Sequence, residues 1–358
     1  MSKVICSPGC YVQGKGEMQR LADYCSKIGA KAAYLLIDQF IYDTYKEQII
    51  SSFEAEGFAY TIGIFGGECS ENEIQRHKMA LGQAGVIIGI GGGKTLDTAK
   101  AIAFYTSISI IVVPTAASTD APCSRLSVVY TDSGTFDHYL PLNKNPDIVI
   151  MDTEIIAKAP VRFLMAGIGD ALATYYEAAA CEQSNAVTMA GGHITKAAFT
   201  LAKLSLETLL EDGIKAKLAA EQGVTSKALE NIVEASTYLS GIGFESSGLA
   251  AAHAIHNGLT VLEETHHLLH GEKVVFGTIC QMVLENRPME EIRVIVDFCK
   301  RCNLPTTFKA MGMDQVSDEK LMAVAVASCA EDDTMGNMPF VVEPEDIVAA
   351  MKIADQIA

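Results

Sequence analysis

The chain has 358 residues, of which 49% are hydrophobic and 20% charged, and its net charge is −17 because 44 acidic residues outnumber 27 basic ones. A single hydrophobic core seldom grows beyond about 250–300 residues, so this length predicts two domains, and the high hydrophobic content excludes a disordered chain. The negative charge opposes binding to nucleic acid or to anionic lipid, which leaves a small neutral molecule or a bound cofactor as the expected partner.

Short apolar runs alternate with helical patterns over the first 160 residues. Continuous apolar strands separated by helices are typical of a parallel sheet that is covered on both faces. We therefore expect an α/β domain at residues 1–160. The expected strands are 31–38, 60–65, 85–90, 108–113 and 147–151, and the expected helices between them are 16–28, 45–56, 70–83 and 94–105.

Residues 161–287 contain no proline and are rich in Ala, Leu, Glu and Lys. Because proline disrupts the interior of a helix, its absence over so long a span predicts a helical domain. Glycine-rich interruptions, such as 241–243, mark the expected turns between helices. We place the boundary near residues 147–160 and the second domain at 161–358.

The 10 cysteines are spread through apolar surroundings, as expected for reduced thiols in a cytoplasmic protein. Cys299 and Cys302 form a C-x-x-C pair late in an expected helix, where two ordinary helix positions are favoured over a redox or zinc role. The first 16 residues lack the apolar segment of a signal peptide, and no run of about 18 uncharged apolar residues follows. We expect no membrane-spanning helix.

The strongest local signal is the run GIGGGKTLDTAK at residues 89–100, which follows an expected strand and opens an expected helix. Backbone amides in a glycine run can approach a diphosphate closely, and a helix N-terminus favours negative charge. The run is not a Walker A loop, because position 88 is isoleucine, and it is not a G-x-G-x-x-G fingerprint, because position 94 is lysine. A purely structural turn seldom needs three consecutive glycines, so we expect phosphate binding here.

Two other segments follow expected strands. Asp38 by itself would be an ordinary strand-end residue, but beside a diphosphate loop its carboxylate favours NAD over NADP, because it can accept ribose hydroxyls and repel a 2′-phosphate. The loop 114–127 is dense in small hydroxyl side chains and carries one carboxylate, Asp120. It suits a polyhydroxylated ligand, although Ser, Thr and Asp also cap helices frequently.

Several histidines lie in an unusual setting. His253 and His256 share a face of an Ala-rich helix, and His266, His267 and His270 form a second group soon after. A single histidine is more often a satisfied core residue, but several of them together with Asp170 indicate a metal. Two imidazoles and one carboxylate that leave a position open are typical of catalytic zinc or iron(II).

Five motifs occur in the order found in the glycerol dehydrogenases, and from about Ser7 to its end the chain resembles that family. The resemblance implies the dehydroquinate synthase-like fold of the metal-dependent alcohol dehydrogenases. This fold has a Rossmann-like N-terminal domain, an all-α C-terminal domain, and a cleft between them for NAD and a zinc ion. The motifs are GIGGGKTLDTAK, PTAASTDAPCS, AGIGDALATYYEA, GLAAAHAIHNGL and HGEKVVFGT.

The resemblance also implies roles for individual residues. It assigns Asp170, His253 and His270 to the metal and Asp120 to a hydrogen bond with the substrate. It further implies a homo-oligomer, since family members commonly form octamers. The implied cofactor residues are Asp38 at the adenosine ribose, Gly92, Gly93, Lys94 and Asp97 under the NAD with Thr115 and Ser118 nearby, and Ser124, Leu126 and Tyr130 beside the nicotinamide.

Three positions depart from the family pattern. Thr174 stands where many iron-dependent relatives carry a fourth ligand, a histidine, and this favours zinc over iron(II). Arg125 replaces an expected small residue and Gly336 an expected histidine, and both bear on substrate preference.

The implied activity is reversible, zinc-dependent transfer of hydride from glycerol, or a related vicinal diol, to NAD, with dihydroxyacetone as the product from glycerol. A dehydroquinate synthase-like cyclase is the rival enzyme, but its anionic substrate requires several basic residues, and the expected pocket segments offer Arg125 and Lys273. A non-catalytic scaffold is the third alternative, and it would be expected to lack a metal ligand or the glycine loop.

Overall fold

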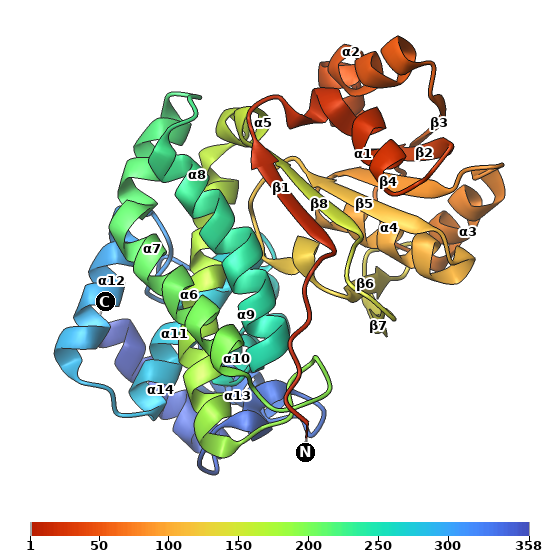
Figure 1. The fold of residues 1–358 in the computed structure, drawn as a ribbon. Coiled ribbons are helices and arrows are strands. Elements are labelled where there is room, and N and C mark those ends of the chain that lie inside the picture. Colours follow the sequence, from red (N-terminus) through yellow and green to blue (C-terminus); the bar gives the residue numbers. More distant parts are fainter. Residues whose placement is uncertain (1, 358) are drawn as a thin grey trace.

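A six-stranded parallel sheet forms the N-terminal half of the computed structural model, which describes residues 2–357 (Figure 1). The strand order is β1-β8-β5-β4-β2-β3, and every neighbouring pair is parallel. All five expected strands are present. The strands are β1 (Cys10–Gly14), β2 (Ala32–Ile37), β3 (Ala59–Ile64), β4 (Val86–Gly91), β5 (Ser109–Pro114) and β8 (Ile148–Asp152).

Both faces of the sheet are covered, as the continuous apolar runs predicted. Alternate residues of β4 point to opposite faces, so Ile88 and Ile90 belong to one hydrophobic cluster and Ile87 to the other. The first cluster includes Leu21 and Phe53 from two of the covering helices. The helices of this half are α1 (Leu21–Lys27), α2 (Gln39–Glu56), α3 (Glu71–Ala80) and α4 (Gly93–Thr106).

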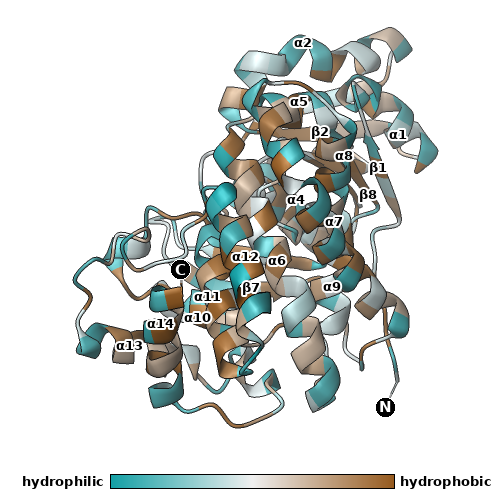
Figure 2. Ribbon diagram, turned by 90° about the vertical axis from the view of Figure 1, so that its left-hand side faces the viewer, coloured by the Kyte–Doolittle hydropathy of each residue, from teal (hydrophilic) through white to brown (hydrophobic). Residues whose placement is uncertain are grey.

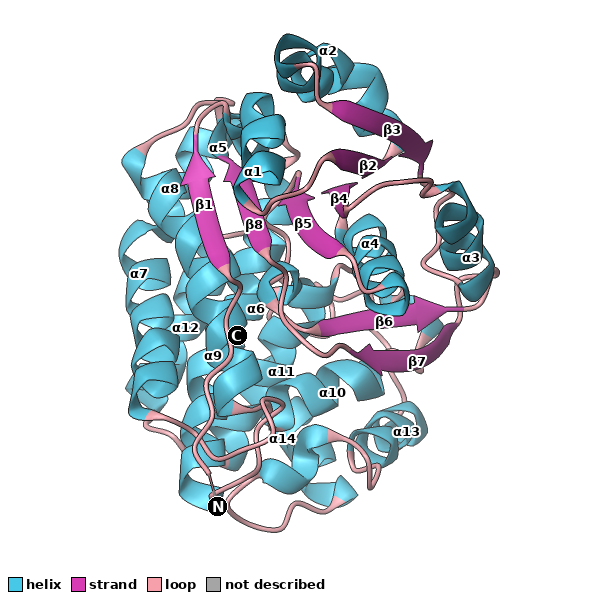
Figure 3. Ribbon diagram, turned by 45° about the vertical axis from the view of Figure 1, so that its right-hand side comes forward, coloured by secondary structure: helices cyan, strands magenta, loops and turns pink. Residues whose placement is uncertain are grey.

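Three strands were not predicted. The edge strand β1 is short and only partly buried, so it lacks the apolar run that marks the other strands. The antiparallel pair β6 (Leu126–Tyr130) and β7 (Phe136–Pro141) lies beside α4 (Figure 3). In β6 buried and half-buried residues alternate over only five positions, and β7 has no buried residue, so neither strand stands out in the sequence.

The second half is helical, which confirms the expected fold class, and α6 runs through its centre between α7, α9 and α11. In Figure 2, teal and brown patches alternate along α7 and α12, as expected for helices with one face toward solvent. The division at residue 160 stays a prediction. The helices are α5 (Thr153–Lys158), α6 (Val161–Ser184), α7 (Lys196–Glu221), α8 (Lys227–Glu234), α9 (Ser240–Ser247), α10 (Ala251–Leu259), α11 (His270–Leu284), α12 (Met289–Arg301), α13 (Asp318–Ser328) and α14 (Pro344–Ile357).

All ten cysteines have free thiols, and Cys299 and Cys302 are buried where α12 ends. Burial raises the pKa of the Cys302 thiol to about 11, which disfavours the reactive thiolate. Among residues 2–357, no helix is both long and apolar enough to cross a membrane.

Candidate active site

Helices α6 and α11 touch at a pair of glycines. A Cβ atom on Gly169 would lie 2.6 Å from the carbonyl oxygen of Gly271, and one on Gly271 would lie 1.8 Å from that of Ala166. Side chains are therefore excluded at this crossing, and the two backbones approach directly. The contact brings Asp170 of α6 next to His270 at the start of α11, with 3.1 Å between Oδ1 and Nε2.

A third potential ligand comes from α10. Nε2 of His253 lies 3.4 Å from the same Oδ1 of Asp170, and the three ligand atoms of Asp170, His253 and His270 lie within 4.8 Å of one another. Asp170 and His253 are buried, whereas the His270 side chain is 38% exposed, so the group is open on one side. Two nitrogens, one oxygen and an open position match the donor set of a catalytic zinc or iron(II) site.

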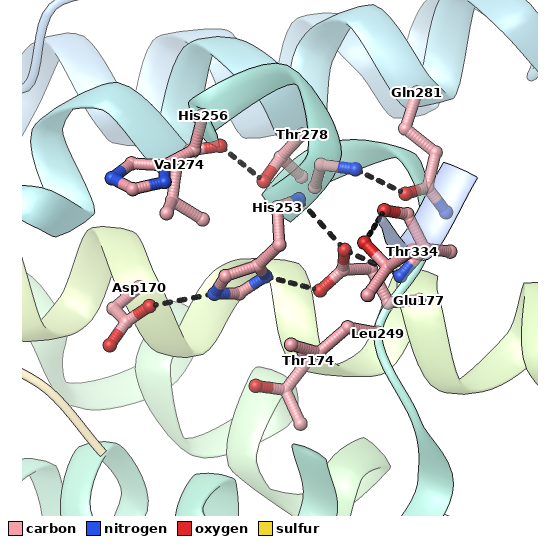
Figure 4. A network of polar contacts seen from close by, with 12 residues as sticks. Asp170, Thr174, Glu177, Leu249, His253, His256, Val274, Thr278, Gln281 and Thr334 are labelled. Carbon is pink, nitrogen blue, oxygen red and sulfur yellow. Dashed lines mark hydrogen bonds and ion pairs between the residues drawn. The ribbon is translucent and has the colours of Figure 1, made fainter. Parts of the chain in front are cut away.

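The buried partner of His253 shows that this group suits a cation. Oε2 of Glu177 lies 2.6 Å from Nδ1 of His253 (Figure 4). Because an ionised carboxylate only accepts hydrogen bonds, Nδ1 carries the proton, and the Nε2 lone pair faces Asp170. Oδ1 of Asp170 is buried and has no hydrogen-bond partner among residues 2–357. Two acceptors facing each other repel. Burial lowers the pKa of His253, but Glu177 and Asp170 outweigh it and raise this pKa well above its usual value, so either a second proton on Nε2 or a divalent cation between the two atoms satisfies both.

His270 is oriented by a second chain of hydrogen bonds. Its Nδ1 lies 2.9 Å from Nε2 of His256, whose Nδ1 lies 3.0 Å from Oδ1 of Asn257. The amide of Asn257 donates to both carboxylate oxygens of Asp333, which fixes its orientation. Burial, reinforced by the nearby His270 and Lys273, lowers the pKa of His256 well below its usual value, so this ring is neutral. With Nδ1–H of His256 donating to Asn257, His270 donates from Nδ1 and keeps its Nε2 lone pair free.

Asp120 lies beside the ligand group. Its backbone N–H donates to Oδ2 of Asp170 at 3.2 Å, and its side chain is buried. Burial, and then the charge of Asp170, raises the pKa of Asp120 well above its usual range. For Asp170 itself burial acts in the same direction, but His270 and His253 outweigh it and lower the pKa of this carboxyl. The structure thus brings the expected substrate residue and the expected metal ligands together.

The expected cofactor residues gather at the carboxyl ends of β2, β4 and β5. The backbone N–H of Asp38 donates to Ile90 at 3.0 Å, and that of Thr115 donates to Gly91 at 3.1 Å. A Cβ atom on Gly92 or Gly93 would meet no other atom within 4 Å, so packing does not explain these two glycines. They leave room over the N-terminus of α4, and this space suits a diphosphate.

Asp38 has a structural role beside its expected one. Oδ1 caps α2 by accepting the backbone N–H groups of Phe40 at 2.9 Å and Ile41 at 3.3 Å. Oδ2 accepts no hydrogen bond from any residue in the described range 2–357. One carboxylate oxygen is therefore available to a ligand while the other holds the helix start.

Lys94 and Tyr130 lie together next to the glycine loop. Nζ of Lys94 lies 5.2 Å from the centre of the Tyr130 ring and forms an ion pair with Glu68. Burial raises the pKa of Tyr130 to about 12, so its hydroxyl stays protonated at neutral pH. The pair places one positive charge and one apolar ring face at the edge of the expected cofactor site.

Asp97 is engaged within the protein. Oδ1 lies 3.0 Å from Nζ of the buried Lys100, and Oδ2 accepts the backbone N–H of Val128 at 3.2 Å. Lys100 also donates to the carbonyl oxygens of Leu126 at 2.6 Å and Ala121 at 3.3 Å. These contacts join α4 to the loop and strand that carry the residues expected beside the nicotinamide. Asp97 therefore helps to fix the position of this segment.

The remaining expected residues lie in the loop after β5. Ser118 is half-buried in the part of the loop that packs on α6. This packing is close, because a Cβ atom on Gly167 would lie 2.1 Å from the carbonyl oxygen of Ala117. The Ser124 hydroxyl is buried and donates to the carbonyl oxygen of Ala121 at 2.9 Å. Ser118 therefore lies where this loop contacts the helical half, whereas Ser124 is held within the loop itself.

The two remaining departures are Arg125 and Gly336. Arg125 donates to the carbonyl oxygen of Met189 at 3.0 Å and pairs with the buried Glu245, at 3.4 Å. Gly336 lies in a short 3₁₀ turn, Thr334–Asn337, whose side chains hold the carbonyl groups just before α10. A Cβ atom on Gly336 would meet nothing within 4 Å, so this position stays open.

Four polar residues of the site were not recognised in the sequence, and each has at least one partner far away along the chain. Glu177 carried the clearest signal, because it follows Asp170 by seven residues and so lies on the same face of α6. The other three, Ser240, Asn257 and Asp333, stand in no local pattern that indicates a role.

Comparisons with known proteins identify the family and the fold. The family model of iron-containing alcohol dehydrogenases matches residues 8–153. The glycerol dehydrogenase of Citrobacter freundii is 53% identical, over 99% of this chain and 98% of its own length. That of Thermotoga maritima is 50% identical, over 98% and 96% respectively. The crystal structure of glycerol dehydrogenase from Schizosaccharomyces pombe has a TM-score of 0.95 and 40% identity, and the match covers 99% of this chain and 91% of that one.

Proposed function

The chain belongs to the iron-containing alcohol dehydrogenase family, among its glycerol dehydrogenases, and on this premise we propose that it oxidises glycerol to dihydroxyacetone with NAD and zinc. The observation that carries the proposal is the convergence of Asp170, His253 and His270 on one point, with Asp120 beside them. The reaction is reversible, and related vicinal diols are expected to be substrates as well.

The proposed metal ligands are Asp170, His253 and His270. A divalent cation at this point supplies a Lewis acid, which lowers the pKa of an alcohol oxygen at neutral pH. The surrounding residues prepare the ligands for it, since Glu177 and His256 each keep one Nε2 lone pair unprotonated. Zinc is favoured over iron(II) because the side chain at position 174 is a threonine hydroxyl, bonded to Ser240 at 2.7 Å, so the chain offers three ligands.

The proposed cofactor site lies over the glycine loop. NAD supplies a nicotinamide ring that accepts the hydride. Gly92 and Gly93 leave space for the diphosphate, Lys94 adds a positive charge, and Asp38 offers one free carboxylate oxygen to a ribose hydroxyl. The charge of Asp38 repels a 2′-phosphate, which supports NAD over NADP.

Asp120 is proposed to accept a hydrogen bond from a substrate hydroxyl. Because its backbone holds Asp170, the same residue couples the position of the substrate to that of a metal ligand. The rival cyclase remains disfavoured, because its anionic substrate needs free positive charges. Arg125 is paired with Glu245, and burial lowers the pKa of Lys273, which disfavours its charged form.

The proposal is tested by measuring NADH formation with NAD and glycerol before chelation, after chelation, and after zinc is added back. Activity that disappears with the chelator and returns with zinc supports both the reaction and the metal. If zinc-replete protein forms no NADH with glycerol, propane-1,2-diol or butane-2,3-diol, the diol reaction is wrong. The cyclase is then tested with its own phosphorylated, carboxylated substrate.

We also propose that the protein forms a homo-oligomer, with an octamer expected from its family. Light scattering coupled to size-exclusion chromatography measures the mass of the assembly directly. A mass equal to that of one chain would contradict this part of the proposal.

A further inference from the structure

A short chain of hydroxyl groups ends on the carboxylate of Asp120. The Ser240 hydroxyl donates to Oδ2 of Asp120 at 2.6 Å, and Oγ1 of Thr174 lies 2.7 Å from Oγ of Ser240. All three residues are buried. When the single proton of Ser240 is given to the carboxylate, Thr174 has to be the donor in the second bond. The network therefore has one direction, from α6 through α9 to the loop that carries Asp120.

The backbone around Ser240 is built for this contact. A five-residue π turn, Ala235–Leu239, comes directly before Ser240. Such turns are rare, occur often at functional sites, and change the face that the following residues present. Here the turn is followed by the start of α9, where Ser240 meets Asp120.

Two glycines of α9 allow the close approach, and they lie within the helix instead of at the turn expected for 241–243. A Cβ atom on Gly241 would lie 2.9 Å from the carbonyl oxygen of Asp120, and one on Gly243 would lie 2.7 Å from Cγ2 of Thr174. Neither position has room for a larger residue without a shift of the backbone or of a side chain. The close packing of α9 against the loop and against α6 therefore holds Ser240 between Asp120 and Thr174, its two hydrogen-bond partners.

Asp120 keeps one oxygen free in this arrangement. Oδ2 is taken by Ser240, whereas Oδ1 accepts no hydrogen bond from the part of the chain that the structure describes. The terminal torsion of an aspartate has a broad, shallow preference, so a carboxylate held at neither oxygen turns easily. One hydrogen bond to Oδ2 is enough to set the direction in which Oδ1 points.

We propose that Ser240 is a positioning residue that determines substrate specificity, by holding Asp120 so that Oδ1 accepts a hydrogen bond from a second hydroxyl of the substrate. The enzyme thereby selects vicinal diols and polyols over alcohols with one hydroxyl. Thr174 supports Ser240 as the outer link of the same network. This inference rests on the proposed function, because it takes Asp120 as the residue that binds the substrate.

The test compares kcat and KM for propane-1,2-diol and glycerol with those for propan-2-ol, in zinc-loaded wild type and in the Ser240→Ala variant. Loss of the one hydrogen bond that orients Asp120 predicts a fall of about tenfold in kcat/KM for the diols, mostly through KM. Turnover of propan-2-ol, which has no second hydroxyl, changes by less than about twofold on the same reasoning. The preference for diols therefore falls.

Three further variants separate positioning from general damage. Thr174→Val removes the outer hydroxyl and is expected to shift the preference in the same direction by a smaller factor. Thr174→Ser keeps the hydroxyl and is expected to behave like wild type. Ser236→Ala is the matched control, because this buried serine of the π turn donates only to the carbonyl oxygen of Ile232. Its diol preference and zinc content are expected to equal those of wild type.

Each result distinguishes a failure of the proposed function from a failure of the specificity role alone. If wild type forms no NADH with any diol, the proposed function itself fails. If wild type is active and Ser240→Ala keeps its diol preference, or loses activity equally on all alcohols, or loses its zinc, the specificity role alone is wrong. If Ser240→Ala does not fold, the Thr174 pair decides, and equal diol preference in Thr174→Val and wild type overturns the inference.

Discussion

Glu177 binds His253 at two points, through its ring and through its backbone. Oε2 lies 2.6 Å from Nδ1 of the imidazole, and Oε1 accepts the backbone N–H of the same residue at 2.9 Å and that of Ala250 at 2.8 Å. One buried carboxylate thus holds both the start of α10 and the orientation of its first histidine. Because the carboxylate cannot donate, it also decides which ring nitrogen carries the proton.

The first prediction concerns this tautomer. In the Glu177→Gln variant, a side-chain amide that accepts both backbone N–H groups directs its NH₂ group at Nδ1, so the proton of His253 moves to Nε2. Metal affinity is then expected to fall by about 10–100-fold. Zinc content after dialysis against graded chelator concentrations measures the change. Glu182→Gln, an exposed position on the same helix, is the control, and equal zinc retention in both variants would contradict the tautomer argument.

The second prediction distinguishes two glycines of the run 89–93 by the space around them. Gly92→Ala adds a methyl group to open space, so the melting temperature is expected to stay unchanged while Kd for NAD rises by about tenfold, roughly 1.4 kcal/mol. Gly89→Ala instead places Cβ 2.7 Å from that of Ala99 and is expected to destabilise the fold by roughly 1–3 kcal/mol. Thermal unfolding and NAD titration of the two variants show the contrast. Unchanged NAD affinity in Gly92→Ala would place the diphosphate elsewhere.

The third prediction concerns the buried pair under the cofactor loop. Lys100→Met leaves the carboxylate of Asp97 and two carbonyl groups without their cation, and the expected loss of stability is about 3–5 kcal/mol. Urea unfolding measures it. The exposed pair of Lys158 with Glu154 is the control, since Lys158→Met is expected to cost less than about 1 kcal/mol. Similar losses in both variants would show that the Lys100 contacts do not stabilise the loop.

The fourth prediction concerns pH. Burial, helped by Arg76, lowers the pKa of His77 although Glu73 opposes it, and the ring bonds Tyr34 at 2.7 Å. Since the unfolded histidine titrates near 6.5, the unfolded state binds more protons below that pH. The contribution of His77 to stability is therefore present above about pH 6.5 and is lost as pH falls toward the lower folded value.

The free energy of unfolding in urea, measured at several pH values between about 5 and 7.5, checks this expectation. His77→Gln removes the titrating group, so the fall in stability toward acid pH is expected to be shallower than in wild type. Parallel pH profiles of the two proteins would assign the acid sensitivity to other groups.

The sequence by itself determined the layered α/β half, the helical half and the family. Buried parallel strands need continuous apolar runs, and a long helical region avoids proline, so both features are written locally. The glycine run before α4 is local as well, because close backbone approach depends on the residues at that turn. The kinds of ligand, a carboxylate on one helix and imidazoles on others, were visible for the same reason.

Tertiary structure alone decided which polar groups meet. Glu177 bonds to His253, which is 76 positions away in the sequence, and Ser240 bonds to Asp120, which is 120 positions away. Neither contact has a local pattern, since each joins segments that only the packing of the chain brings together, as where Gly241 of α9 lies against the carbonyl oxygen of Asp120. A hydrogen bond works only within a few tenths of an ångström, and that precision comes from the packing of the whole core.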